Sequence, residues 1–259
     1  MSGSIHPTAV VAGDARIAPG VEIGPYSVIG GDVAIGEGSV IGAHVVIAAR
    51  TTLGRRNRVF QFASLGEIPQ DRKYGGQPTR TVIGDDNVIR EYVTIHAGTA
   101  QDRGVTTVGN GNWLLAYSHI AHDCVIGDGT TFSNNAQLAG HVVIDDQATL
   151  GGFVGVHQFC RVGAHAFIAA GSIVLQDVPP YVTAAGYPAK PRGINSEGLR
   201  RRGFASDDLA AIKRAYKTLY RSSLPFEDAR AQIVTEAKAA AVLAPLAAFL
   251  ETAGRGIIR

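Results

Sequence analysis

Residues 21–42 read VEIGPYSVIGGDVAIGEGSVIG. Isoleucine recurs at every sixth position, at Ile23, Ile29, Ile35 and Ile41, and glycine follows each of them. A period of six is neither the 3.6-residue period of a helix nor the two-residue alternation of an ordinary strand. It is typical of a hexapeptide parallel β-helix, in which strands of about four residues, joined by two-residue corners, fill a prism-shaped core with one aliphatic side chain each.

The six-residue rhythm covers most of the first 180 residues. It starts at Ile5, breaks over about 66–81 and 98–107, and then runs without interruption from Val108 to Val174. Three hexads make one coil of about 18 residues, so the pattern predicts about eight to nine coils. The pattern continues on both sides of each break, so we expect two loops that leave the prism at its corners. Long loops in compact folds are often functional.

The C-terminal part follows a different pattern. The hexads stop after Tyr181, and from about Asn195 the apolar residues have helical spacing. Ser206 is predicted to cap one helix, a second is expected over about 226–238, and a third before Gly254. We therefore predict a solenoid over residues 1–190 and a small helical domain over 191–259 that covers the end of the prism and packs on neighbouring subunits.

Composition excludes several classes of protein. The net charge of +2 is too small to argue for nucleic-acid binding, and the N-terminus lacks the features of a secretory signal. The longest apolar run, Ala239 to Leu250, is too short to span a bilayer, so a cytoplasmic protein without a transmembrane segment is expected. Cys124 and Cys160 are predicted to be structural, because two coils separate them by more than a disulfide can bridge.

The 18-residue coil predicts which polar side chains gather on one edge. Gly140 should lie above His122, Gln158 above Gly140, and His141 above Asp123. An imidazole beside a carboxylate is a candidate general base with its orienter. A glycine above that base leaves its own N–H uncovered, as an oxyanion donor requires. We therefore predict acyl transfer, with His122 as the base, Asp123 as its orienter and Gly140 as the oxyanion donor, and expect no cofactor and no metal.

Two further histidines are expected near this edge. His96 comes next to the His122 column if the second loop preserves the register. His119 is expected at a corner, at the end of the preceding hexad, in a positioning role. Two alternatives stay open: a zinc site of the γ-class carbonic anhydrase kind, with His119, His122 and His141 as ligands, and a scaffold without catalysis. No Gly-x-Ser-x-Gly, P-loop or dinucleotide motif occurs.

The chain resembles the UDP-N-acetylglucosamine O-acyltransferase family over its whole length. The matching stretches are VFQFASLGE (59–67), QDRKY (70–74), TIH (94–96), HIAHDC (119–124), NN (134–135), LAGHV (138–142), HQFC (157–160), GLRRRGF (198–204) and RGIIR (255–259). The resemblance implies a left-handed β-helix and a homotrimer with active sites between subunits. It also implies transfer of a (3R)-3-hydroxyacyl chain from acyl carrier protein to the 3-hydroxyl of UDP-N-acetylglucosamine, the first step of lipid A biosynthesis.

The resemblance also assigns binding residues. Those lining the sugar and acyl pocket would be Asp71, Lys73, His96, His119, His141 and Gln158. Those reaching the nucleotide phosphates and nearby groups would be Asn195, Glu197, Arg201 and Arg202, and guanidinium groups suit phosphate. Basic residues would also offer a surface for the acidic carrier protein.

Two positions depart from the family pattern. Ala97 follows His96 where some members carry arginine, so any phosphate contact from that position is lost. Ala169 and Ala170 lie where the family gauges acyl length. A methyl group there predicts a shorter acyl chain than in relatives that carry glycine.

Overall fold

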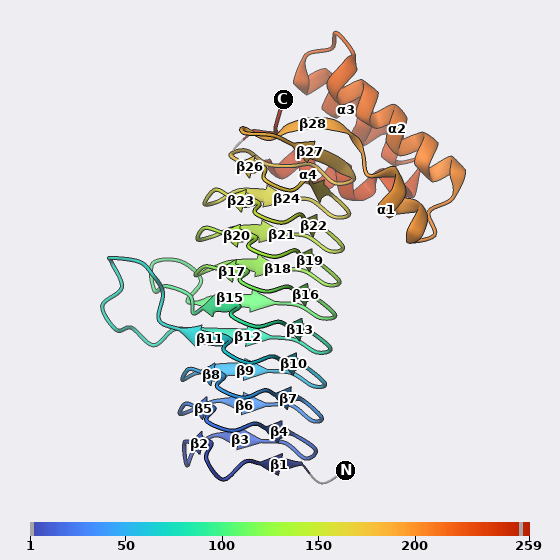
Figure 1. Ribbon diagram of the computed structural model, residues 1–259. Helices are drawn as coiled ribbons and strands as arrows, with labels where there is room; N and C mark the ends of the chain where they lie inside the picture. The colour runs from blue at the N-terminus through green and yellow to red at the C-terminus, as the bar shows by residue number, and fades with distance from the viewer. Residues whose placement is uncertain (1–2, 254–255) are drawn as a thin grey trace.

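The computed structural model describes residues 3–253 and 256–259, and its main body is a left-handed parallel β-helix with three faces (Figure 1). Strands three apart in the chain stack on the same face in parallel register. Most strands are two residues long, shorter than the four expected, because the corners take up the rest of each hexad. Gly254 and Arg255, the latter the first residue of the RGIIR motif, lie outside the described residues.

The strands divide among three faces. Face A contains β1 (Ser4–Ile5), β4 (Glu22–Ile23), β7 (Val40–Ile41), β10 (Arg58–Val59), β13 (Val88–Ile89), β16 (Trp113–Leu114), β19 (Thr131–Phe132), β22 (Thr149–Leu150) and β25 (Phe167–Ile168). Face B contains β2 (Val10–Val11), β5 (Val28–Ile29), β8 (Val46–Ile47), β11 (Ser64–Glu67), β14 (Thr94–His96), β17 (His119–Ile120), β20 (Gln137–Leu138), β23 (Gly155–Val156) and β26 (Ile173–Val174). Face C contains β3 (Arg16–Ile17), β6 (Ala34–Ile35), β9 (Thr51–Leu53), β12 (Arg80–Ile83), β15 (Val105–Val108), β18 (Val125–Ile126), β21 (Val143–Ile144) and β24 (Arg161–Val162).

The apolar residues at every sixth position, which we call anchors, form the core of the prism as predicted. Ile29, Ile47, Leu65 and Leu150 are at most 1% exposed, and equivalent residues fill every coil between them. Each such side chain contributes about 2 kcal/mol by leaving water. Cys124 and Cys160 are buried in the same core.

Two loops leave the prism on the same side (Figure 1). The first joins β11 to β12 through residues 68–79, and the second joins β14 to β15 through residues 97–104. Both are shorter than predicted, because the flanking residues extend the strands. The second loop preserves the register, since Ile95 pairs with Ile120.

The solenoid continues further than the hexads do. β27 (Val182–Ala185) pairs in parallel with β25, and β28 (Lys190–Ile194) returns antiparallel to it, so paired strands continue after the hexads stop at Tyr181. Four α-helices and a 3-10 turn follow: α1 (Ser196–Arg201), α2 (Ser206–Arg221), α3 (Phe226–Ala237), η1 (Ala241–Leu243) and α4 (Ala244–Thr252). They cover one end of the prism (Figure 1). The division at residue 190 stays a prediction, and β28 begins there.

The helices form a second apolar cluster, in which Leu199, Ile212, Ile233 and Phe249 are buried. Ser206 is the first residue of α2 and Ala205 is at its N-cap, so the predicted cap is wrong by one position. In the part of the chain that the structure describes, no helix has both the length and the apolar character to cross a bilayer.

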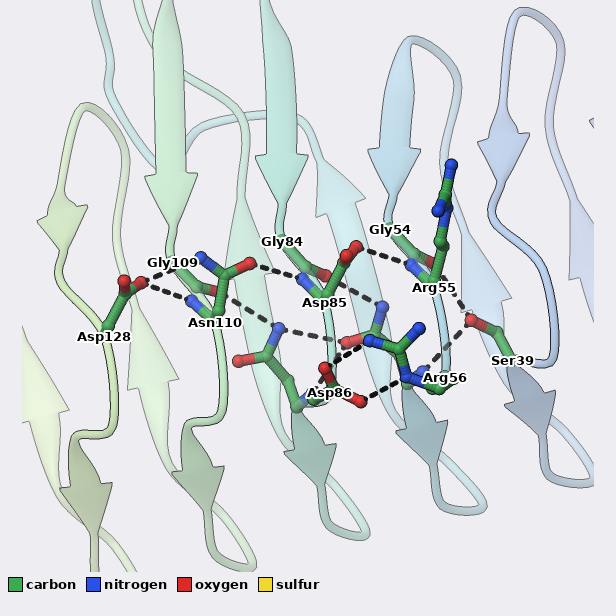
Figure 2. Close-up of polar contacts among 12 residues, drawn as sticks. Ser39, Gly54, Arg55, Arg56, Gly84, Asp85, Asp86, Gly109, Asn110 and Asp128 are labelled. Carbon is green, nitrogen blue, oxygen red and sulfur yellow. Dashed lines mark hydrogen bonds and ion pairs between the residues drawn. The ribbon is translucent and has the colours of Figure 1, made fainter.

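Along one edge of the prism, between faces C and A, side-chain oxygens accept the backbone N–H groups of the preceding coil. The backbone N–H of Arg55, Asp85, Asn110 and Asp128 each donates to a side-chain oxygen of the equivalent residue one coil further on, at 2.6–2.8 Å (Figure 2 shows this as far as Asp128). We call this column, which ends at Asp146, the ladder edge. A Cβ on Gly84, Gly109 or Gly127 would meet the oxygen that caps the next residue. This contact explains the glycines of the ladder edge, whereas a Cβ on Gly24, Gly30, Gly36 or Gly42 would meet the backbone of the next coil.

Candidate active site

A second edge, between faces B and C, carries the residues predicted to form the site. His122, Gly140 and Gln158 occupy equivalent corner positions in three successive coils, as predicted. The N–H of His141 donates to the carbonyl of His122 at 3.0 Å, and that of Phe159 to the carbonyl of Gly140 at 3.2 Å. We call the column of His122, Gly140 and Gln158, with the residues that follow each of them, the histidine edge.

The imidazole of His122 is paired with the carboxylate of Asp123. Nδ1 of His122 lies 2.9 Å from Oδ2 of Asp123, and the side chains are 15% and 0% exposed. An ionised carboxylate only accepts hydrogen bonds, so a neutral imidazole paired with it carries its proton on Nδ1 and keeps a lone pair on Nε2. Within the described residues no donor binds Nε2. This arrangement is the one that a general base requires.

Gly140 makes room for that imidazole. A Cβ at this position would lie 2.5 Å from Cε1 and 2.6 Å from Nε2 of His122. No residue with a side chain fits there unless the ring moves. The N–H of Gly140 has no acceptor in residues 3–253 and 256–259. A free N–H therefore lies beside the free Nε2.

His119 and His96 form a second imidazole pair. His119 lies on β17, not at a corner as expected, because the residue before each anchor belongs to the strand. Its Nδ1 is 2.7 Å from Oγ1 of Thr94, and its ring meets that of His96 edge to face at 5.0 Å. Burial, then His96 and then His122, lowers the pKa of His119 to about 4. Burial also lowers the pKa of His96, so both rings are neutral near pH 7.

His141 has a carboxylate of its own. Its Nδ1 lies 2.6 Å from Oδ2 of Asp102, its ring meets that of His122 edge to face at 4.9 Å, and it stacks on Phe159 at 4.4 Å. His122, Asp123 and His141 form a group with ligand atoms within 4.8 Å of one another, close enough to hold a metal ion. His119 is not in this group, so the alternative zinc site would have Asp123 in place of His119 as its third ligand.

Three residues of the second loop and its flank were missed from the sequence. Thr99 and Thr106 both bind Asp123, and Asp102 binds His141. No periodic rule places a residue inside an excursion from the coil, so the 18-residue count could not find Thr99 or Asp102.

An open groove of about 510 Å³ runs along face B past these residues. It is lined by Gln70, His119, Ala121, His122, Gln137, Leu138, Ala139, Gly140, Gly155, Val156, His157, Ile173 and Leu175. The wall beyond Gly140 is mainly apolar and spans the coils up to Ile173 and Leu175. Of the lining residues, His119, His122 and Gly140 were predicted as site residues and the others were not.

Several predicted binding residues lie outside this groove. Asp71 accepts the N–H of Lys73 at 3.0 Å within the first loop, and the Lys73 carbonyl accepts the Gln101 amide at 3.4 Å, which joins the two loops. Ala169 and Ala170 lie at the corner between faces A and B, on the other side of face B from the histidine edge.

The four residues predicted to bind the nucleotide line a second groove. It has a volume of about 490 Å³ and contains Asn195, Glu197, Arg201 and Arg202 beside Thr149 and Phe167 of face A, with Gly198. Arg201 donates to Glu197 at 3.1 Å and Arg202 to Gln147 at 2.8 Å, and burial lowers the pKa of Arg202.

Asn195 also has a structural role, because its side chain caps α1. It accepts the N–H of Gly198 at 3.2 Å and donates to the His165 carbonyl at 3.0 Å. One chain therefore holds the predicted nucleotide residues together on face A, on a different side of the prism from the histidine edge.

Comparison with known proteins gives the same family throughout. Residues 177–258 match a family model described as "Udp N-acetylglucosamine O-acyltransferase; Domain 2". Residues 14–49 and 106–140 match one described as "Bacterial transferase hexapeptide (six repeats)".

The acyl-[acyl-carrier-protein]–UDP-N-acetylglucosamine O-acyltransferase of Thiobacillus denitrificans is 60% identical over 256 residues, which cover 99% of each chain. That of Herminiimonas arsenicoxydans is 56% identical, over 98% of this chain and 99% of the relative. The solved structure of the Francisella novicida UDP-N-acetylglucosamine acyltransferase superimposes with a TM-score of 0.97 at 48% identity, over 99% of this chain and 94% of that one. The chain therefore belongs to the UDP-N-acetylglucosamine O-acyltransferase family and is an acyltransferase.

Proposed function

We propose that the chain transfers a (3R)-3-hydroxyacyl group from acyl carrier protein to the 3-hydroxyl of UDP-N-acetylglucosamine, with His122 as general base. The substrates are those in the relatives' names, and the reaction is the first step of lipid A biosynthesis. The observation that carries the mechanism is the contact between His122 and Gly140, which brings a free Nε2 and a free N–H together at the wall of an apolar groove.

The chemical step follows from these two atoms. Nε2 of His122 takes the proton of the sugar hydroxyl as its oxygen attacks the thioester carbonyl, and Asp123 stabilises the imidazolium that forms. The N–H of Gly140 donates to the oxyanion of the tetrahedral intermediate. Collapse of the intermediate breaks the carbon–sulfur bond, and the departing thiolate takes the proton from His122. Each group ends as it began, and no covalent enzyme intermediate is needed.

The positions of the two grooves support a homotrimer. The acyl chain would lie on the apolar wall of face B, while Arg201 and Arg202 would bind the diphosphate beside face A. The two grooves lie on different sides of the prism, so we infer that face A of a neighbouring subunit supplies the nucleotide residues. The donor is carried by a protein, so the reaction belongs in the compartment that holds the carrier, the cytoplasm.

The test is acyl transfer from loaded carrier protein to UDP-N-acetylglucosamine. His122→Ala should lose at least about 1000-fold in kcat, since it removes the base. His44→Ala is the matched control, because His44 stacks between Tyr26 and Phe62 at a different edge, and it should keep the parent rate. Parent-like turnover by His122→Ala would remove the proposed base.

The acyl length is a separate part of the proposal. Ala170 is the position given by family resemblance, whereas Ile173 and Leu175 line the far end of the groove. Ala170→Gly should favour longer chains in a series of acyl carrier proteins. If Ala170→Gly leaves the acyl-length preference unchanged and Ile173→Ala shifts it, then Ile173, not Ala170, determines the acyl length.

The metal alternative rests on the spacing of His122, Asp123 and His141. It predicts stoichiometric zinc in the purified protein and loss of turnover after chelation. The general-base mechanism predicts full turnover in protein that has been treated with a chelator.

A further inference from the structure

The carboxylate of Asp123 is buried without a cation. Its side chain is 0% exposed, and among residues 3–253 and 256–259 no lysine or arginine forms an ion pair with it. A buried carboxylate is costly unless hydrogen-bond donors satisfy its oxygens. The groups that supply those donors therefore decide where this carboxylate points.

One residue of the second loop supplies most of them. The N–H of Thr99 lies 3.0 Å from each oxygen of Asp123, and its hydroxyl donates to Oδ2 at 2.6 Å. Thr106 accepts the N–H of Asp123 at 2.8 Å and holds its backbone at a φ of 59°. Thr99 and Thr106 are at most 1% exposed, so water does not compete for these contacts. The remaining donor to the carboxylate is Nδ1 of His122.

The same loop keeps a second imidazole away from that carboxylate. Nδ1 of His141 is only 4.0 Å from Oδ2 of Asp123, the oxygen that His122 uses. Asp102 binds this Nδ1 at 2.6 Å instead. Without Asp102, the proton on His141 would have one carboxylate within reach, and His122 would have to share it.

We propose that Thr99 and Asp102 are positioning residues that give each imidazole its own carboxylate. Thr99 holds the carboxylate of Asp123 in position to bind His122. Asp102 binds the N–H of His141, so that His141 does not bind Asp123. His122 then keeps its proton on Nδ1 and its lone pair on Nε2, toward Gly140. The catalytic consequence rests on the proposed base role of His122, but the positioning can be measured without it.

Thr99→Val tests the first half, because it removes the hydroxyl and keeps the N–H and the shape. It should lower kcat about tenfold with little change in KM, since the base is misdirected and the substrate contacts remain. Thr99→Ser restores the hydroxyl and should restore kcat. Thr107→Val is the matched control: Thr107 is a half-buried threonine on β15 and should tolerate the same change.

A spectroscopic readout separates positioning from catalysis. An imidazole N–H bound to a carboxylate gives a downfield proton resonance, which can be assigned to His122 by its loss in His122→Ala. The signal should disappear or broaden in Thr99→Val and persist in Thr99→Ser and Thr107→Val. A parent-like signal in Thr99→Val would overturn the proposal whatever the activity. Loss of the signal at an unchanged kcat would instead count against His122 as the base.

A double-mutant cycle tests Asp102. Asp102→Asn should lower kcat in the parent, because His141 then competes for Asp123, and should have a smaller effect when His141 is already replaced by Gln. An equal fold-loss in both backgrounds would remove Asp102 from the proposal. If Thr99→Ser does not show the His122 resonance, Thr99 is likewise not a positioning residue for Asp123.

Discussion

The ladder edge and the histidine edge are two different corners of the prism that use glycine in opposite ways. On the ladder edge, Gly127 leaves room for Oδ1 of Asp146, which caps the N–H of Asp128. On the histidine edge, Gly140 leaves room for the imidazole of His122, and its own N–H has no acceptor among the described residues. On the ladder edge the glycine allows a backbone N–H to be capped, and on the histidine edge it leaves a backbone N–H without an acceptor among the described residues. The difference lies in the side chain of the adjacent coil, which caps backbone in one case and carries a base in the other.

The largest expected effect is that of Gly140→Ala. The new methyl group must displace the ring of His122, so kcat should fall on the order of 1000-fold, about 4 kcal/mol in the barrier. The midpoint of thermal unfolding should change little, because the ring can move toward solvent. Acyl-transfer kinetics and thermal unfolding on the same sample check both statements, and an active Gly140→Ala would contradict the role of this glycine.

Acid should destabilise the protein through His119, beside the histidine edge. The pKa of His119 falls from its usual 6.5 in the unfolded chain to about 4 in the folded one, because burial disfavours the cation. Between these values the unfolded chain binds more protons, so stability falls as pH drops from about 6.5 to 4, by up to about 3 kcal/mol. His119→Gln should flatten unfolding curves over this window. Equal acid sensitivity in the variant and the parent would refute the assignment.

Gly127→Ala should have the opposite effects on stability and on kcat to those of Gly140→Ala. Its Cβ would meet Oδ1 of Asp146, so the variant should lose about 2 kcal/mol of stability while the folded enzyme keeps its kcat. Thermal unfolding and active-site-normalised kinetics measure the two quantities. A lost kcat in Gly127→Ala would mean that the two edges are not independent.

The smallest expected effect is that of Asp128→Ala. The change uncovers the N–H of Asn110, which Asp128 accepts at 2.6 Å, and should cost about 1 kcal/mol without affecting turnover. Asp207→Ala, in the first turn of α2, offers a comparison at an exposed aspartate that caps no other coil. An equal cost in both variants would show that the ladder contact adds nothing.

The fold could be predicted from the repeat because every hexad follows the same local rule, one buried aliphatic side chain per strand, independently of the other hexads. Counting in steps of 18 also placed His122 under Gly140, since both lie in uninterrupted coils. The same counting put His119 at a corner, because it assigned the residue before the buried Ile120 to the end of the preceding hexad, whereas that residue belongs to strand β17. Beyond Tyr181 the hexad rule makes no prediction, and β27 pairs with β25 there without a hexad.

The remainder of the site depends on contacts that have no period. Thr99 reaches Asp123 from an excursion of the chain, and its position follows only from the folded loop. Arg201 and Arg202 were assigned by resemblance, because nothing in their spacing connects α1 to face A. In the proposed homotrimer a neighbouring copy would bring those arginines to the histidine edge, and no pattern in the sequence specifies such a contact.

The most direct test of the open histidine edge is chemical rescue of His122→Gly. This change should leave a space the size of an imidazole between Gly140 and Asp123, and acyl transfer should nearly stop. Adding imidazole should restore a large part of the rate in a saturable way, and should do much less for His122→Gly combined with Gly140→Ala. A His122→Gly enzyme that transfers acyl groups at the parent rate without imidazole would contradict the account.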